Sequence, residues 1–336
     1  MIASFFEQPL NVPAGIAPRL RCPSCRGVLR TASAAAVQCV DCSAEYLVVN
    51  GAPILTDAGR SVLTPQEIIA AYEDERRRPP LSALGRLAWA VVSCAPHVTS
   101  YRRQEIIARR FADLLRSRTT APAILLVGSG TEGIGLSALQ AIPGATLCEF
   151  DVYLTDSRML VADLLDLPFE SGTFDAVVAQ GVLEHVIDPF RAVAEMHRAL
   201  KPHGLVFSTT PFVLGVHLPV TDYTRFTRLA LLRLFRSFRP IERDVVEGAA
   251  VSLAYSLAYF WMALLSSFGW PAGAKIAKYS GNYLIFWLRH VDALLRRSPV
   301  SIDAAASYYY FGQKSDETLS DREIVGMFKG LGLCPW

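Results

Sequence analysis

Charge of either sign is scarce in this chain of 336 residues, and lysine is nearly absent. Only 19% of the residues are charged, and the formal net charge is +2. Such a balance gives no general surface for polyanions, so nucleic acid is disfavoured as a partner. The N-terminal segment also lacks a basic stretch followed by a long apolar core, which a secretory signal would need. We therefore expect a cytoplasmic protein.

Cysteine is infrequent as well, with seven residues in the chain, yet four of them form a pattern. Cys22 and Cys25 stand in CPSC, and Cys39 and Cys42 stand in CVDC after thirteen intervening residues. This spacing is typical of two knuckles around one tetrahedral zinc ion. Two disulfides are the alternative, but they fit poorly in a chain without an export signal. We predict a closed tetrathiolate zinc site with a structural role.

The residues around these cysteines carry a family resemblance. Asn50 and Gly51 lie between two short apolar segments and predict a tight hairpin. Together, CPSC, CVDC and NGAPIL resemble the zinc ribbon of the tRNA-methyltransferase activator family over residues 18–57. The resemblance implies a small zinc-ribbon domain. After it, the TPQE capping box that begins at Thr64 predicts one helix, and a second helix is expected to open at Ser100.

Residues 123–136 read AILLVGSGTEGIGL, which predicts a buried strand, a glycine-rich turn and the start of a helix. Glycine in such a turn permits positive φ and lets a ligand lie against bare backbone, facing the N–H groups of the next helix. An ordinary tight connection would tolerate these glycines too. Asp151 then ends the second predicted strand, where doubly wound sheets bind the ribose hydroxyls of an adenosine. Further strands are predicted at 174–180, 205–209 and 307–313. Between the first two of these, Asp188 before Pro189 predicts the start of a helix, and residues 202–204 predict a turn.

Three motifs carry a second resemblance: VADLLDLPF, FDAVVAQGVLEHV and HRALKPHGLVFSTTPF. They are similar to the core of class I S-adenosylmethionine (SAM)-dependent methyltransferases over about residues 124–212. The resemblance implies an α/β fold, a doubly wound Rossmann-like sheet with the zinc ribbon in front and an apolar helical insertion before the last strand. It also implies SAM as cofactor, bound by Gly128, Ser129, Gly130, Gly133, Asp151, Asp163, Leu164 and Gln180.

Two positions depart from the family pattern. Leu126 stands where many members carry an acidic residue, and Glu132 replaces the third glycine of the turn. A subgroup with a GTEG-like turn and a DYxRFT segment resembles this chain at these places. The departures keep open a non-catalytic alternative, in which the chain retains the fold as a scaffold without using the cofactor.

Methyl transfer is a displacement at the sulfonium methyl, so the acceptor must be aligned and, where it carries a proton, deprotonated. His185 in LEHV is one candidate for these tasks, and its structural alternative is a helix-start histidine. His217, Asp222 and Tyr223, in the segment after the fifth strand, are the others. As an alternative, this DYTRF segment docks its loop onto the next helix.

No charged residue occurs between positions 248 and 274, a length that would permit a membrane span. A single crossing would separate the strand at 307–313 from its sheet, and the apolar run at 283–295 is interrupted by charges. We expect residues 249–295 to be helical and to contact a membrane surface, cover an apolar acceptor or form a homodimer face. A peripheral position at the inner face of the membrane is therefore an option.

We expect five parts along the chain and a methyltransferase for a small-molecule or lipid-linked acceptor. An RNA or protein methyltransferase that docks through the ribbon is the second enzyme hypothesis, although no stacking aromatics are interleaved with the basic residues. The parts are a ribbon with an N-terminal arm (1–60), a linker with helices (61–120), the methyltransferase core (121–247), the apolar insertion (248–300) and the last strand with the tail (301–336).

Overall fold

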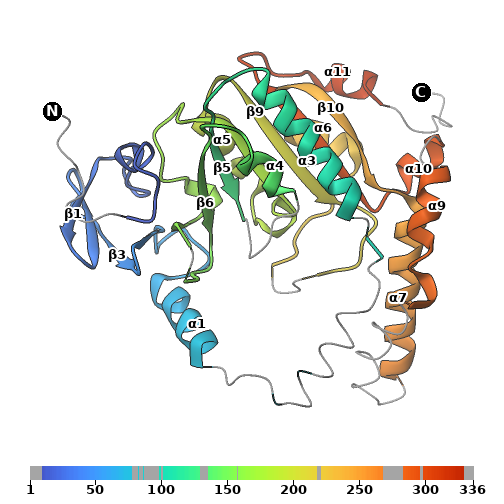
Figure 1. The fold of residues 1–336 in the computed structure, drawn as a ribbon, viewed down its shortest axis with the longest axis horizontal. Helices are drawn as coiled ribbons and strands as arrows, with labels where there is room; N and C mark the ends of the chain where they lie inside the picture. Colours follow the sequence, from blue (N-terminus) through green and yellow to red (C-terminus); the bar gives the residue numbers. More distant parts are fainter. Residues whose placement is uncertain are drawn as a thin grey trace.

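A single mixed sheet of eleven strands runs through the computed structural model, in the order β1-β2-β3-β4-β7-β6-β5-β8-β9-β11-β10. Figure 1 shows this sheet with the N-terminal strands on one side and the helices α7 and α9 on the other. The structure describes residues 10–77, 82, 86, 98–99, 101–128, 135–156, 158–217, 221–267, 283–295 and 298–328.

The core of the sheet is doubly wound around its central strand β5. Five parallel strands are followed by an antiparallel pair, because β11 inserts between β9 and the edge strand β10. The strands in spatial order are β7 (Leu160–Ala162), β6 (Thr146–Asp151), β5 (Ala123–Val127), β8 (Phe174–Gln180), β9 (Leu200–Pro211), β11 (Ser307–Lys314) and β10 (Phe238–Glu247). This arrangement confirms the predicted fold class.

Both faces of the core sheet are covered, which explains why its strands read as continuous apolar runs. In β5, Ile124 and Leu126 pack toward the first face and Leu125 and Val127 toward the second. The first face is covered by α3 (Tyr101–Arg116) and α4 (Leu136–Gln140), and the second by α5 (Pro189–Ala199), α6 (Arg228–Leu234) and α11 (Asp321–Gly326).

The ribbon continues the same sheet. Its strands β1 (Leu29–Ser33), β2 (Ala36–Cys39), β3 (Glu45–Val49) and β4 (Ala52–Leu55) form an antiparallel meander. Asn50 and Gly51 both have positive φ, 50° and 76°, as the predicted hairpin requires. Strand β4 then pairs in parallel with β7, with Ile54 opposite Val161. The ribbon therefore covers what would be an open edge of the core.

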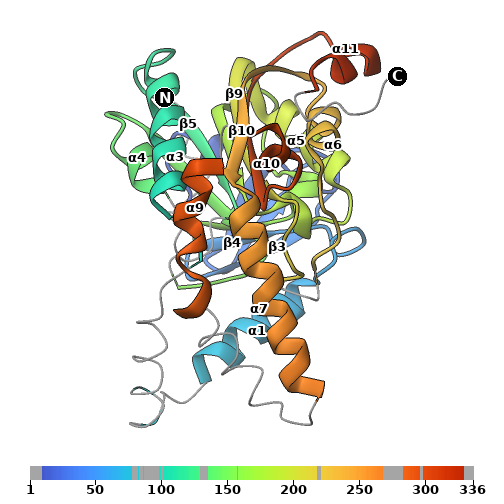
Figure 2. The ribbon, with the colours of Figure 1, turned by 90° about the vertical axis from the view of Figure 1, so that its right-hand side faces the viewer.

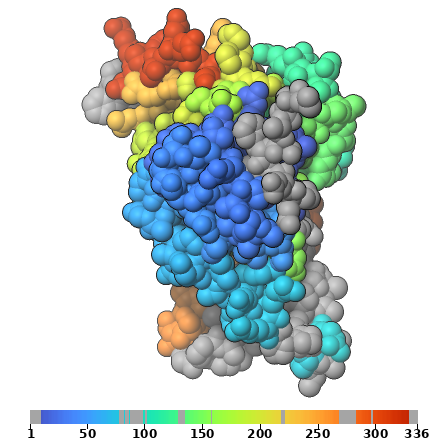
Figure 3. Space-filling view, turned by 90° about the vertical axis from the view of Figure 1, so that its left-hand side faces the viewer, coloured from blue at the N-terminus to red at the C-terminus, as the bar shows by residue number. Residues whose placement is uncertain are grey.

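Helix α1 (Pro65–Arg77) begins at the predicted capping box, in which Thr64 and Glu67 bond each other's backbone N–H groups. Its buried Ile68 and Tyr72 pack against β4 and β7 at the junction of ribbon and core. Figure 3 shows the ribbon and α1 occupying one side of the molecule.

Helices α7 (Ala249–Ser267) and α9 (Leu288–Leu295) pack together at the other side, and the short α10 (Pro299–Asp303) leads back to β11. The Asp292 carboxylate of α9 accepts hydrogen bonds from the N–H groups of Gly248, at 2.6 Å, and Ala250, at 2.9 Å.

Figure 2 shows α7 extending away from the sheet. Of the described helices, α7 is long and apolar enough to cross a membrane, a weak indication because core helices can pass the same test. The described parts of 249–295 are mainly helical, as predicted.

Two sequence predictions need correction. The spacing of Leu231, Leu234, Phe235 and Phe238 predicts one core face of a helix, but α6 ends at Leu234 and Phe238 opens strand β10. The turn predicted at 202–204 lies within β9, where His203 takes a φ of 62° and the pairing with β8 shifts register. Strand β10 was missed because its sequence, FRPIERDVVE, mixes charges with apolar residues at a sheet edge.

Candidate functional site

Four of the predicted cofactor residues lie at one edge of the sheet, at the carboxyl ends of neighbouring parallel strands. Gly128 follows β5, Asp151 ends β6, Asp163 follows β7 and Gln180 ends β8. This edge is where open α/β sheets bind ligands. Leu164 follows Asp163 and is buried. Ser129, Gly130 and Gly133, like Glu132, lie outside the described residues.

Gly128 combines two features that together favour glycine. Its φ is 59°, a left-handed conformation, and a Cβ atom there would lie 2.6 Å from Cγ2 of Val182. Its N–H group donates to the carbonyl of Phe150 on β6, at 3.0 Å. Gly128 is therefore held between the end of β6 and the segment that follows β8, and it places no side chain where a bound cofactor would approach.

The carboxylates of Asp151 and Asp163 are both fixed by local contacts. Asp151 accepts from the N–H of Val152 at 2.7 Å, and it lies 3.7 Å from the buried guanidinium of Arg158. Asp163 caps the short helix η2 (Leu164–Asp166) by accepting from the N–H of Leu165 at 2.9 Å. Their positions at the strand ends are thus set before any ligand binds.

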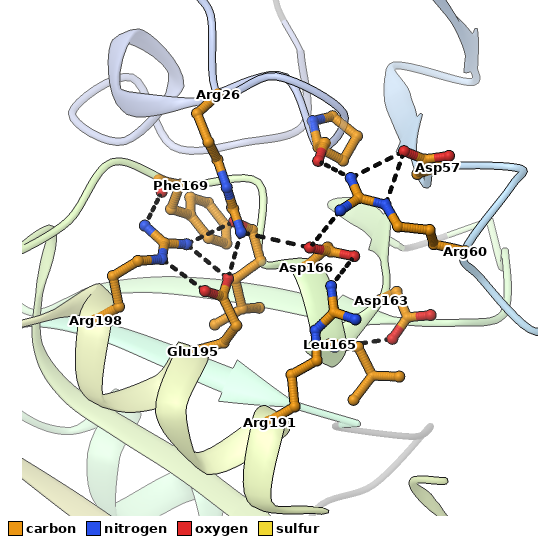
Figure 4. Close-up of polar contacts among 12 residues, drawn as sticks. Arg26, Asp57, Arg60, Asp163, Leu165, Asp166, Phe169, Arg191, Glu195 and Arg198 are labelled. Atoms are coloured by element: carbon orange, nitrogen blue, oxygen red, sulfur yellow. Dashed lines mark hydrogen bonds and ion pairs between the residues drawn. The ribbon is translucent and has the colours of Figure 1, made fainter. Parts of the chain in front are cut away.

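Arginines of the ribbon hold the loop that follows Asp163, as Figure 4 shows. The half-buried Arg26 donates to Glu195 of α5 at 2.9 Å and to the carbonyl of Leu167. Asp166 of η2 is buried and contacts three guanidinium groups, those of Arg26, Arg60 and Arg191, with the shortest distance, 2.7 Å, to Arg191.

The pKa of Glu195 reflects the arginines that surround it where the ribbon meets the core. Burial alone would raise the pKa of this carboxyl group, but the guanidinium groups of Arg198 and Arg26 outweigh burial and lower it. The junction therefore depends on ionised carboxylates, and it joins the ribbon to the segment that carries Asp163 and Leu164, two of the predicted cofactor residues.

The four predicted zinc ligands come together. Their Sγ atoms all lie within 4.8 Å of one another, with 3.7 Å between Cys22 and Cys42 and 3.4 Å between Cys25 and Cys39. Four sulfurs at about 2.3 Å from a tetrahedral ion would be about 3.8 Å apart, so the donor set fits zinc. Gly27 is needed beside it, because a Cβ atom there would lie 2.8 Å from the Cys39 sulfur.

Three of the four predicted catalytic side chains meet after β8 and β9. His185 ends the short helix η3 (Leu183–His185), and its Nε2 lies 3.2 Å from Nε2 of His217. Nδ1 of His217 lies 3.5 Å from Asp222, which also accepts from the backbone N–H of His217 at 2.8 Å. Tyr223 is different, because its backbone N–H donates to the Glu184 carbonyl while its side chain is half-exposed.

Sequence reasoning missed Glu184, the buried carboxylate of this cluster. Its Oε1 lies 3.9 Å from Nε2 of His185 and 3.7 Å from Nε2 of His217. The only signal was its place beside His185 in LEHV. Glu184 raises the pKa of His217, and Arg225 lowers the pKa of Asp222 to about 2. The cluster combines two imidazoles with two carboxylates, a set suited to proton transfer or to holding a cation.

Comparison with known proteins agrees with this geometry. Residues 128–208 match the family model described as a methyltransferase domain. The ubiquinone/menaquinone biosynthesis C-methyltransferase UbiE of Geotalea daltonii is 41% identical over 90 residues, which cover 26% of this chain and 38% of that protein. The demethylmenaquinone methyltransferase of Clavibacter sepedonicus is 42% identical over 103 residues, covering 27% and 42%.

Among solved structures, the 1,6-didemethyltoxoflavin-N1-methyltransferase of Burkholderia thailandensis is similar with a TM-score of 0.40 and 14% identity. That alignment covers 82% of this chain and 98% of the other. The chain spans about two fifths of the length of the two curated relatives named above. The residues matched by the family model run from Gly128, after β5, into strand β9, and they include the predicted cofactor residues Asp151, Asp163 and Gln180.

Proposed function

We propose that this protein is a SAM-dependent methyltransferase that moves a methyl group to a small-molecule or lipid-linked acceptor. The observation that carries the proposal is the convergence of Gly128, Asp151, Asp163 and Gln180 at the carboxyl edge of a doubly wound parallel sheet. In this proposal Gly128 faces the methionine part of SAM, Asp151 binds the ribose hydroxyls and Asp163 lies at the adenine.

Two observations support an apolar or lipid-linked acceptor. The relatives named above act, by their names, in quinone biosynthesis and on demethylmenaquinone. In this chain the apolar helix α7 contacts the segment that precedes His217, because the Tyr259 hydroxyl donates to the Val216 carbonyl at 2.5 Å. The Tyr259 ring also packs on Gly215. An acceptor held along α7 would therefore lie near the histidines.

The surface of α7 supports a membrane contact as the origin of such an acceptor. Leu253, Phe260 and Trp261 are exposed on α7, and Leu284 and Trp287 are exposed beside α9. Several large apolar side chains exposed on packed helices are typical of membrane or protein contacts. A lid over the acceptor and a homodimer face are the other roles that such a surface supports.

In the same proposal the four ribbon cysteines bind a structural zinc ion. The ion would occupy a closed site and stabilise a domain too small for a large core of its own. RNA docking through the ribbon is less well supported, because Arg26 and Arg60 already pair with Asp166 of the core.

Methyl-labelled SAM tests the function directly. The full chain would be incubated with it and, separately, with extracted membrane lipids, total RNA or a protein extract. We expect label in the lipid fraction, in a compound that an Asp151→Asn variant does not label. Label in RNA or protein alone would favour the second enzyme hypothesis. No labelled product, together with no binding of S-adenosylhomocysteine, would leave the scaffold alternative.

A further inference from the structure

The cluster of Glu184, His185 and His217 has the geometry of a metal site rather than of a hydrogen-bonded pair alone. The three facing atoms, one carboxylate oxygen and two Nε2 nitrogens, are separated by 3.2, 3.7 and 3.9 Å. The point in their plane that is equidistant from all three lies about 2.1 Å from each, and a tetrahedral position about 0.7 Å out of that plane lies about 2.2 Å from each, close to the usual zinc distances to histidine nitrogen and carboxylate oxygen. Separations near 3.4 Å are typical of tetrahedral coordination, whereas octahedral neighbours would be about 3 Å apart.

Contacts behind the rings orient both nitrogens toward this point. Nδ1 of His185 lies 3.2 Å from the Thr221 carbonyl, which can only accept, so the proton belongs on Nδ1 and Nε2 presents a lone pair. Nδ1 of His217 faces Asp222, which Arg225 holds in turn. A histidine whose second nitrogen bonds a carbonyl or carboxylate is typical of metal ligands.

A separate observation points to a missing ligand. Glu184 is 1% exposed, and its Oε2 atom has no hydrogen-bond partner among the described residues. Burying an unpaired carboxylate oxygen is costly, whereas a bound cation would compensate the charge. Glu184 and Asp222 together carry two negative charges against the one positive charge of Arg225, so the local balance favours a cation.

We propose that Glu184, His185 and His217 bind a divalent transition metal ion, with zinc as the ion that the distances fit. Both histidines are partly exposed, so three protein ligands would leave a coordination position open toward solvent. The site lies beside the predicted cofactor turn, because Val182, two residues before Glu184, packs on Gly128. This second site differs from the ribbon site, in which four thiolates would fill the coordination sphere.

The open position indicates the class of acceptor, an inference that rests on the proposed methyltransferase function. A hydroxyl oxygen of an alcohol, phenol or enol bound there loses its proton to water more readily, because a metal ion lowers the pKa of a bound hydroxyl. That oxygen then bonds the methyl carbon of SAM while the carbon–sulfur bond breaks, and the electron pair of that bond stays on sulfur. The products are a methyl ether and S-adenosylhomocysteine.

Metal content measured on the full chain tests the proposal without an acceptor. After equilibration with zinc and desalting, we expect about two zinc ions per wild-type chain and about one in Glu184→Gln and His217→Ala. His203→Asn is the matched control, because this exposed histidine lies in a left-handed turn that asparagine tolerates. It should keep about two ions.

About one ion in the wild type, unchanged in His217→Ala, would overturn the metal proposal. Titration with S-adenosylhomocysteine on the same samples separates this failure from failure of the proposed function. Wild-type protein that binds S-adenosylhomocysteine but only one zinc ion would support the methyltransferase function and contradict the second metal site. Two ions without product binding would support the metal site and contradict the methyl transfer assigned to it. If Glu184→Gln loses both ions and its melting temperature falls strongly, this variant is misfolded, and the zinc content of His217→Ala decides the result.

Discussion

The ribbon and the pair α7 and α9 are both additions to the methyltransferase core, but they are attached in different ways. The ribbon joins the sheet through the strand pair β4 and β7 and through ion pairs to Asp166 and Glu195. Helix α7 follows β10 at the opposite edge, and the described contacts near its start are an apolar cluster and the cap from Asp292. Figure 1 shows the two additions on opposite sides of the core.

This difference indicates what each addition can do. Changes in the ribbon reach the loop after Asp163 through the ion pairs of Arg26 and Arg60, so the ribbon can influence cofactor binding from within the fold. Helix α7 leaves aromatic side chains exposed, and its Tyr259 contacts the segment before His217. We therefore expect ribbon variants to change stability and cofactor affinity, and α7 variants to change acceptor or membrane contacts.

The largest effect is expected from Cys39→Ser, which removes one ligand of the ribbon site. Because binding of structural zinc contributes about 10 kcal/mol or more to the folding of such small domains, the ribbon should unfold and strand β4 should leave β7. Zinc content and hydrogen exchange at residues 52–55 and 160–162 would measure this loss. Val40→Ser, an exposed change in the same knuckle, should leave both values as in the wild type. Continued protection of β4 in Cys39→Ser would show that the ribbon does not need the ion.

A smaller loss is expected from Arg26→Ala, which removes one cation from Glu195 and Asp166. Since the Arg26 side chain is 37% exposed, solvent screening should limit the cost to about 1 kcal/mol of unfolding free energy. Denaturant unfolding would measure it against Arg30→Ala, an exposed arginine on β1, which should change little.

The loss of stability in Arg26→Ala should depend on pH. The pKa of Glu195 is lowered in the folded protein, so its contribution is present above the unfolded pKa, about 4.3, and is lost as the pH falls. The difference in stability between wild type and Arg26→Ala should therefore shrink in acid. A difference that grows below pH 4 would contradict the assigned ion pair.

At the other side of the core, Asp292→Asn should cost about 1 kcal/mol, because the amide keeps one acceptor oxygen but loses the charge at the start of α7. The effect should be local. Hydrogen exchange over residues 249–258 should increase, while affinity for S-adenosylhomocysteine stays unchanged. Glu317→Gln, in an exposed position, is the control. If Asp292→Asn lowers the affinity for S-adenosylhomocysteine as much as a ribbon variant does, the two additions do not differ in their effect on cofactor binding.

The smallest effect on stability is expected from Trp261→Ser on the exposed surface of α7, within about 0.5 kcal/mol. Its effect should appear in sedimentation with vesicles of phosphatidylcholine and phosphatidylglycerol, from which the variant dissociates more readily than the wild type. Val62→Ser, another exposed apolar residue, should bind as the wild type does. If neither protein binds vesicles, the α7 surface does not contact membranes and instead covers the acceptor or forms a homodimer face.

Local signals in the sequence were enough for much of the fold. Strand β8 spans the predicted residues 174–180, Asp188 caps α5 as its position before Pro189 implied, and the four cysteines converge. Each of these features follows from residues close together in the chain, where spacing and capping chemistry decide the outcome.

The features that the sequence did not indicate depend on residues far apart. Arg26 and Glu195 are separated by 169 positions, and the sequence around each residue does not indicate that they pair. Glu184 appears as an ordinary charged residue until the fold buries it against His217. Asp292 was noted as an interruption of an apolar run, whereas in the structure it caps α7.

We propose above all that the carboxyl edge of β5, β6, β7 and β8 binds SAM, and calorimetric titration of the full chain with S-adenosylhomocysteine measures that binding. We expect about one molecule bound per chain, and an affinity reduced about tenfold or more in Asp151→Asn, because a charged hydrogen bond to the ribose is lost. No binding heat and no thermal shift in wild-type protein would contradict it.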